Sequence, residues 1–343
     1  MIQDIIIADS LHLIHLGLIK RCLNYWVHGC KDLQVKFFNH QIDVISSWLE
    51  KSNERIPSEI HRSIRSLSCL AFWKGVEYRT FLYYLGPVIL KENLSSEIYN
   101  HFLLLFCAVF LCSCLCFSTK LDLAEKMFKD YIEGFINIYG IHAISSNIHN
   151  LCHVVEDVRR FGPLDKLSSY PFENKLGMIK NRLKSGYRPL AQVAKRELEL
   201  KNHPAYLHSN EQFSLKNEIL DPYQKPPGVN LAFKKVLLKN GICFAANLKD
   251  QWMLTKSNEI LRIHCIFKTN NELMFYGSKI KKLSNFFDYP FPSSNINIYF
   301  CKEVFSEYIN IKEQEIKCKL VGISYKNQTV FFPLVHTLDI FNN

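Results

Sequence analysis

The sequence has no Cys-x-x-Cys pair, although it contains 12 cysteines among 343 residues. It therefore lacks the paired spacing that marks zinc ribbons and zinc fingers. Cysteines with apolar neighbours, such as Cys107, Cys112 and Cys152, are typical of reduced thiols in the core of an intracellular protein. The N-terminus carries Asp4 and Asp9 and has no basic start, so we expect no signal peptide.

Long uncharged segments are also scarce. Residues 102–117 form an uncharged run of 16 residues. A membrane-spanning helix needs about 20 apolar residues and usually has basic flanks, which this run lacks. We therefore expect a buried central helix and no membrane partner, and a membrane-associated protein is the weaker alternative.

The composition is that of a globular protein, with 48% hydrophobic and 22% charged residues. The chain is long enough for two domains and a substantial core. Its net charge of +10 is spread along the sequence. This favours an acidic partner such as nucleic acid, although moderately basic proteins that bind none are common.

The pattern of apolar residues changes along the chain and predicts an α+β protein. Residues 5–8 are a short strand-like run, and helical spacing follows to about residue 201. Residues 202–230 contain five Pro or Gly positions between 204 and 228 and are expected to be a linker. The expected domains are a helical domain (1–201), the linker (202–230) and a small antiparallel β domain (231–343).

Individual elements follow from the same periodicities. Helices are expected near 40–52, 75–91, 95–116, 121–139, 144–161, 171–185 and 189–201. Strands are expected at 242–246, 260–267, 273–276, 296–301, 317–323 and 329–334, which are rich in β-branched and aromatic residues. Asn270-Asn271 and Lys326-Asn327 resemble hairpin turns between them.

The most informative chemistry surrounds Glu173. This acid stands in a Pro-Phe-Glu-Asn segment and is followed, up to Arg196, by seven Lys or Arg and no Asp or Glu. A lone carboxylate beside a basic helix suits a group that holds a divalent metal while its neighbours hold phosphates. The alternative is a helix start with an acid in its first turn and a solvated basic face.

A family resemblance favours the first interpretation. The chain resembles the closing part of the catalytic region of CACTA-type (En/Spm-like) DNA transposases over roughly residues 5–200. Four phrases carry it: Asn147-Ile-His149-Asn-Leu-Cys-His153, Asp157-Val-Arg-Arg-Phe-Gly-Pro-Leu164, Tyr170-Pro-Phe-Glu-Asn174 and Arg188-Pro-Leu-Ala-Gln192. The segment from Asp9 to Gly17 resembles the D-x-x-H segment of the family, and residues 56–81 and 86–90 resemble its helical middle.

The resemblance implies a metal-dependent DDE chemistry. Three carboxylates hold two divalent cations, with Mg²⁺ as the natural ion. In this resemblance Asp9 is the second carboxylate and Glu173 the third, and His12 either orients Asp9 or is an ordinary helix histidine. The implied fold is the remnant of a ribonuclease-H-like domain with a helical insertion, followed by the β domain. A similar D-x-x-H arrangement occurs in the recombinase of antigen-receptor rearrangement.

The first carboxylate of the family has no counterpart here. Only eight residues precede Asp9, and Asp4 lies too far along the run, at about 17 Å for five strand residues, to replace it. We therefore expect the C-terminal portion of a transposase, acting in the nucleus on DNA and inactive alone, with a homo-oligomer as a further option. The alternative is a captured, non-catalytic DNA-binding or scaffold protein.

Further side chains are candidates for binding. The expected phosphate contacts are Arg159, Arg160, Lys180, Arg182, Lys184 and Arg188. Tyr170 and Phe172 are either core aromatics or stack on an unpaired base. His149, His153 and Asp157 share one helix face, which indicates either a transition-metal site or, with more weight, a structural polar stripe.

Overall fold

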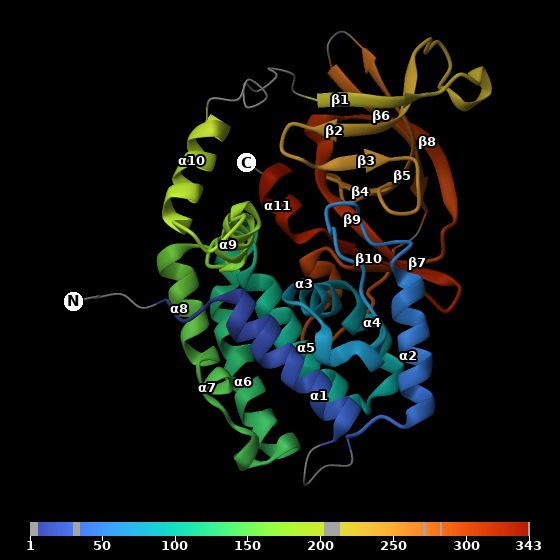
Figure 1. The fold of residues 1–343 in the computed structure, drawn as a ribbon. Coiled ribbons are helices and arrows are strands. Elements are labelled where there is room, and N and C mark those ends of the chain that lie inside the picture. Colours follow the sequence, from blue (N-terminus) through green and yellow to red (C-terminus); the bar gives the residue numbers. More distant parts are fainter. Residues whose placement is uncertain (1–5, 30–34, 202–212, 270–271, 282, 342–343) are drawn as a thin grey trace.

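The protein folds into a helical body joined to an antiparallel β domain, an α+β arrangement (Figure 1). This computed structural model describes residues 6–29, 35–201, 213–269, 272–281 and 283–341. We call residues 6–201 the helical body and residues 213–341 the β domain. The expected hairpin turn at Asn270-Asn271 lies outside the described residues.

Most helices of the body begin and end close to the expected positions. They are α1 (Lys20–His28), α2 (Asn39–Ser52), α3 (Gly75–Thr80), α4 (Gly86–Asn93), α5 (Ser96–Cys112), α6 (Leu121–Tyr139), α7 (Ser146–His149), α8 (Leu151–Phe161), α9 (Tyr170–Arg182) and α10 (Pro189–Lys201). π-Helical segments span Ser10–Ile19 and Phe81–Leu85, and 3-10 turns span Leu67–Phe72, Leu115–Lys120 and Ile141–Ala143.

The expected strand at residues 5–8 is a wrong prediction for the part that the structure describes. Residues 6–8 have no regular structure. A strand needs a neighbouring strand to satisfy its amides, and here the backbone N–H groups of Ile7 and Ala8 donate instead to the Asp157 carboxylate, at 2.7 and 2.9 Å. The β-type composition of the run is therefore not accompanied by strand pairing, and of the described residues 6–8 Ala8 alone is buried while Ile6 is 48% exposed.

The uncharged run forms the centre of the helical body. Every residue from Phe102 to Cys112 is buried, and α5 packs against α6 and α4. Among the described residues, no helix is long and apolar enough to cross a membrane. The expectation of a buried central helix is confirmed.

His101, immediately before this run in α5, carries a pH-dependent contribution to stability. Its ring stacks on Tyr131 with centroids 4.2 Å apart, and Nε2 lies 2.8 Å from the Tyr131 carbonyl oxygen. Burial lowers the pKa of His101 to about 4, against a smaller opposite effect of that hydrogen bond. The native ring is therefore neutral at pH 7.

Between about pH 6.5, the ordinary histidine pKa, and pH 4, the unfolded chain binds a proton that the native state does not. The free energy of unfolding should therefore fall by about 1.4 kcal/mol per pH unit through this window from His101 alone. In urea titrations at pH 7 and 4.5, His101→Gln should show a smaller acid loss than the parent. The exposed His40→Gln is the control, and an unchanged acid loss in His101→Gln would contradict this assignment.

The β domain is built on a ten-stranded antiparallel sheet. Its strands are β1 (Phe213–Glu218), β2 (Ala232–Leu238), β3 (Cys243–Ala245), β4 (Trp252–Thr255), β5 (Ile260–Thr269), β6 (Glu272–Ile280), β7 (Tyr299–Cys301), β8 (Phe305–Lys312), β9 (Ile316–Tyr325) and β10 (Gln328–Pro333), followed by α11 (Val335–Phe341). The main path of pairing is β1-β2-β5-β4-β9-β10-β7, with β3 on β2 and with β6 between β5 and β8.

The sheet begins earlier than expected. Strand β1 lies inside the segment 202–230 that was expected to be a linker, and residues 202–212 lie outside the described residues. Pairing of Phe213 with Leu238 and of Leu215 with Val236 places β1 on the edge of β2. The Lys326-Asn327 turn agrees with the expectation, since both residues have positive φ between β9 and β10.

The two parts share one hydrophobic core. Residues of the helical body and residues such as Trp252, Phe331 and Leu338 form a single buried cluster. Polar contacts reinforce it: Asp339 accepts hydrogen bonds from the amides of Leu115 and Cys116. The β domain is therefore fixed against the helices, and a surface can be built from both.

Candidate functional site

Asp9 is held in place from both sides. Asp157 fixes the two amides that precede it, as described above. The Oδ1 atom of Asp9 accepts hydrogen bonds from the Leu11 amide at 3.1 Å and from the Ser169 amide at 3.0 Å. Asp9 thereby caps the π-helix Ser10–Ile19, a type of helix that is rare and occurs often at functional sites. The Ser169 contact ties this cap to the segment that begins α9.

His12 stands between Asp9 and Glu173. Its Nδ1 lies 2.5 Å from Asp9 Oδ2, and its Nε2 lies 3.5 Å from Glu173 Oε1. Two carboxylates 164 positions apart in the sequence therefore meet at opposite edges of one imidazole ring. The structure brings together the three residues that the family resemblance selects.

Because the His12 ring lies between the two carboxylates, they cannot both coordinate one ion in this arrangement. Its side chain is 57% exposed, and that of Glu173 is 54% exposed. Both side chains therefore have room to rotate. A divalent cation can enter between Asp9 and Glu173 if His12 swings outward or itself becomes a ligand.

Asp9 is an anion at neutral pH. Burial alone would raise the pKa of its carboxyl, but the hydrogen bonds with His12, Ser169 and Leu11 outweigh that effect and hold the pKa below its ordinary value. A carboxylate must be deprotonated to bind a metal ion. Asp9 meets this requirement before any ion arrives.

Tyr170, in the first turn of α9, contacts the π-helix that follows Asp9. Its hydroxyl lies 3.1 Å from Nδ1 of His15, which is only 1% exposed, and burial keeps the His15 pKa well below its ordinary value. A Cβ atom at Gly75 would lie 2.4 Å from Leu11 and 2.8 Å from the Tyr170 hydroxyl. A side chain at position 75 would therefore push Leu11 or Tyr170 away, and glycine lets α3 approach α9 and the Asp9 segment without that shift.

Phe172 behaves differently from Tyr170. It is 71% exposed, so the expectation that it is a core aromatic is wrong. The α9–α10 hairpin to which it belongs has no buried residue and also exposes Leu176 and Tyr187, at 65% and 70%. This leaves an open aromatic and basic surface beside Glu173.

The six expected phosphate contacts fall into two groups. Arg159 forms ion pairs with Asp122 and Glu125 of α6, so its charge is used within the helical body. Arg160 lies on the same turn, with its guanidinium 4.9 Å from the Phe161 ring centre. These two residues are separate from the hairpin.

The hairpin group is itself divided. Arg182 pairs with Glu197, which also binds Lys175 at 3.0 Å. Lys180 and Lys184 are exposed, and neither pairs with a carboxylate of the described residues. Arg188 has a left-handed backbone (φ 45°) and lies over the Tyr187 ring at 5.2 Å. Lys180, Lys184 and Arg188 are therefore the best-placed candidates of the six.

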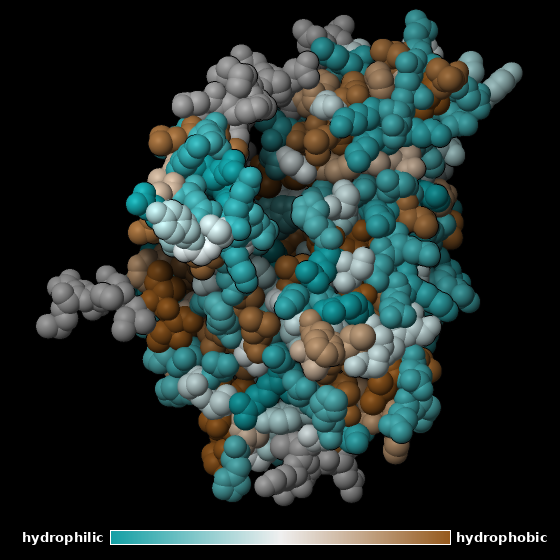
Figure 2. Space-filling model, viewed as in Figure 1, coloured by the Kyte–Doolittle hydropathy of each residue, from teal (hydrophilic) through white to brown (hydrophobic). Residues whose placement is uncertain are grey.

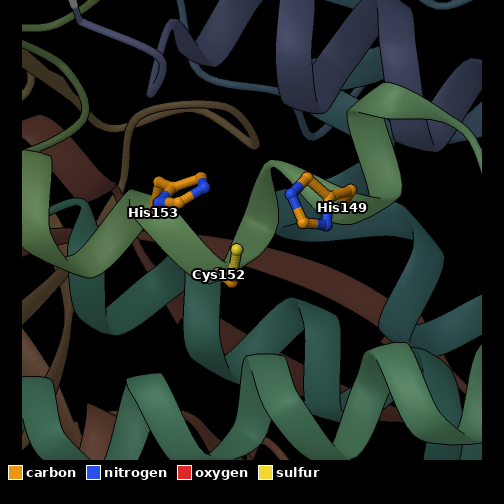
Figure 3. A group of neighbouring side chains, drawn as sticks. All are labelled: His149, Cys152 and His153. Carbon is orange, nitrogen blue, oxygen red and sulfur yellow. The ribbon is translucent and has the colours of Figure 1, made fainter.

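His149 and His153 do meet, together with Cys152. Their ligand atoms lie within 4.8 Å of one another, and Figure 3 shows the Cys152 sulfur between the two rings. The thiol is exposed, so the expectation of a core cysteine is wrong here. Two imidazoles and a thiolate suit a borderline ion such as Zn²⁺ rather than Mg²⁺.

Asp157 does not join that cluster. Its carboxylate is 5% exposed and serves the Ile7 and Ala8 amides. Its spacing of four residues from His153 predicted that it shares a helix face with the histidines. Spacing alone does not show that the Ile7 and Ala8 amides, distant in sequence, lie next to its carboxylate. The turn at Asn150, between α7 and α8, further separates His149 from the helix that carries Asp157.

Comparison with known proteins concerns the β domain. A family model described as a domain of unknown function, DUF8592, matches residues 212–334. The match begins one residue before β1 and ends one residue after β10, so it covers every strand of the β domain. No curated protein and no solved structure matches the chain significantly.

Proposed function

We propose that the chain is a transposase-derived DNA-binding protein in which Asp9 and Glu173 are two ligands of a divalent-metal site of DDE type. The observation that carries the proposal is the contact of His12 with both carboxylates. Mg²⁺ is the preferred ion because the acidic ligands are hard oxygen donors. This metal would polarise a scissile phosphate and lower the pKa of an attacking water or hydroxyl.

DNA reaches this site over the α9–α10 hairpin. The exposed cations Lys180, Lys184 and Arg188 lie on the same hairpin as Glu173. Phosphate contacts position a duplex without reading its sequence. The proposal therefore includes DNA binding without strong sequence preference, and a nuclear location follows from it.

The first prediction from this proposal concerns duplex binding. The variant Lys180→Ala/Lys184→Ala/Arg188→Ala should lower the slope of log affinity against log salt by about 2.7, at about 0.9 for each lost phosphate contact. Fluorescence anisotropy with a labelled duplex at several salt concentrations measures this slope. The matched control is Lys249→Ala/Lys268→Ala/Lys302→Ala, which removes three exposed charges from the β domain. Equal slopes for both variants would mean that the hairpin is only a solvated face.

The second prediction concerns catalysis. Two carboxylates fall one short of the three that hold a metal pair, so the purified chain with Mg²⁺ or Mn²⁺ should neither nick nor join DNA. Relaxation of a supercoiled plasmid is the measurement. Nicking that disappears in Asp9→Ala or Glu173→Ala would show instead that another residue completes the site.

The competing function is a non-catalytic DNA-binding or scaffold protein. It shares the hairpin surface and predicts the same duplex binding. The metal separates the two: a scaffold needs no Mn²⁺ at Asp9 and Glu173, whereas the proposed site binds it. The ordered, ionised Asp9 beside Glu173 favours the metal site.

A further inference from the structure

Two adjoining pockets lie where the helical body meets the β domain. Their volumes are about 400 and 410 Å³, and both are lined by Glu59, His61 and His336. The first reaches Tyr170 and Asn174 on either side of Glu173 in α9, and the second reaches β1 and β2. Figure 2 shows a hollow in this region, between the α9–α10 hairpin and the β domain. We call the two pockets together the interdomain cleft.

The cleft is lined by cationic and titratable bases. They are His61, Arg62, Arg79, Lys216, Lys235 and His336. Among the described residues that line it, Glu59 is the single acid, and its carboxylate already binds Lys319 at 2.8 and 2.9 Å and the Cys243 amide at 2.8 Å. Arg79 is paired with Asp165 at 3.2 Å. Arg62 lies 3.9 Å from the buried Glu77 carboxylate, but its side chain is 49% exposed toward solvent. The positive charge of the cleft that has no carboxylate partner among the described residues is therefore mainly that of Lys216 and Lys235, and it favours an anion.

Two lysines place unpaired positive charge at a defined position in the cleft. Lys216 on β1 and Lys235 on β2 are direct cross-strand partners in the antiparallel pair, so their side chains share one face of the sheet. Like charges directly opposite each other destabilise a sheet. Neither lysine forms an ion pair with a carboxylate in the described part of the chain. An anion bound between them would remove the repulsion.

We propose that the interdomain cleft binds the phosphate groups of a single DNA strand that leaves the Asp9–Glu173 site. Pockets of this volume accommodate a small molecule or one strand rather than a duplex. A strand has regularly spaced phosphates for Arg62 at one end and for Lys216 and Lys235 at the other. The direction toward Glu173 rests on the proposed function, and the phosphate binding itself rests only on the cleft.

The experiment uses the full chain and a fluorescein-labelled single-stranded oligodeoxynucleotide. Lys216→Gln/Lys235→Gln should weaken binding about tenfold and lower the salt slope by about 1.4, at about 0.7 for each phosphate contact on a single strand. Arg62→Gln, at the other end of the cleft, should lower the slope by about 0.7. Lys249→Gln/Lys268→Gln is the matched control, because it removes two exposed β-domain charges that do not line the cleft. Circular dichroism checks that each variant is folded.

Parental affinity in Lys216→Gln/Lys235→Gln and in Arg62→Gln would overturn the proposal. Competition by a deoxynucleoside monophosphate at the same concentration as the strand would overturn it too, because the ligand would then be a free nucleotide. If strand binding is lost only in the hairpin variant Lys180→Ala/Lys184→Ala/Arg188→Ala, the cleft proposal is wrong and the proposed function stands. A loss confined to the cleft variants would support the cleft and sink the hairpin part of the proposed function.

Discussion

Replacing Lys319 by methionine is expected to lower the free energy of unfolding by about 3–5 kcal/mol, the usual cost of removing one partner from a buried charge network. The Lys319 side chain is 0% exposed, and its ammonium lies 2.8 Å from Glu59 and 2.6 Å from Asp250. It also lies 2.5 Å from the Cys243 carbonyl oxygen. Methionine fills the volume but leaves two buried carboxylates without a cation.

This network joins the two parts of the protein. Glu59 belongs to the helical body, whereas Asp250 and Lys319 belong to the β domain, and Asp250 also accepts a hydrogen bond from the Ser58 amide at 3.1 Å. Lys319→Met should therefore loosen the cleft as well as destabilise the fold. Urea unfolding measures the first effect and limited proteolysis of the two parts measures the second.

A matched control is available at the surface. Lys326 pairs with Glu92, but the two side chains are 64% and 43% exposed. Such a pair contributes about 0–1 kcal/mol, so Lys326→Met should be nearly neutral. The combined variant Glu59→Gln/Asp250→Asn/Lys319→Met should be less damaged than Lys319→Met, because it leaves no unpaired charge. If Lys319→Met unfolds like Lys326→Met, the network does not stabilise the protein.

Periodicity predicted the helices well because helical spacing is a local pattern in the sequence. The bounds of α6 and α10 coincide with the expected 121–139 and 189–201. Each of these helices has a continuous helical repeat between breakers, and no distant partner is needed to recognise it. The same holds for α5, whose uncharged run is too short to span a membrane and is long enough to fill the centre of the body.

The strands were less predictable because pairing is not local. β1 was expected to be linker because Pro and Gly residues surround it, and its strand structure depends on pairing with β2. β8 was not expected, because an edge strand that pairs only with β6 keeps polar, exposed residues. At residues 5–8 a strand was expected and none forms in the described part, because a strand-like composition does not guarantee a neighbouring strand to pair with.

The candidate site divides in the same way. The resemblance selected Asp9, His12 and Glu173, and the chain folds them into contact. It could not select Ser169, whose contribution is a backbone amide. The pattern of basic residues gave Arg159 and Arg182 as phosphate contacts, although each has an acidic partner within the chain. Ion pairs with residues 15 or more positions away are invisible in a linear pattern.

Asp157 is the other residue whose replacement should have a large effect. Its Oδ2 accepts hydrogen bonds from the Ile7 and Ala8 amides, and Ala8 is 0% exposed. Hydrogen bonds to a charged group contribute about 1.5–3 kcal/mol each, and an unpaired buried amide is costly. Asp157→Ala should therefore lower the free energy of unfolding by about 2–4 kcal/mol, allowing for partial hydration of the freed amides.

Loss of the Asp157 contact should also weaken metal binding at the site. Asp9 follows directly on the two anchored amides, so without Asp157 the backbone that precedes Asp9 is no longer held. The carboxylate then keeps only its own hydrogen bonds with Ser169, Leu11 and His12. We expect Mn²⁺ binding, followed by electron paramagnetic resonance, to weaken about tenfold to a hundredfold, the usual cost of losing a group that orients a ligand. Asp9→Asn should remove that binding altogether.

Two variants make the assignment specific to the anchor. In the native protein a single oxygen of Asp157 accepts hydrogen bonds from both amides. Asp157→Asn keeps one side-chain oxygen that can accept the same two bonds, so this variant should retain most of the Mn²⁺ affinity. Glu156→Ala removes the same charge from the exposed side of α8 and should leave the affinity unchanged. Thus loss in Asp157→Ala with retention in Asp157→Asn separates positioning of Asp9 from a general effect of charge. Parental Mn²⁺ affinity in a folded Asp157→Ala protein would show that the ligand geometry of Asp9 does not depend on this contact.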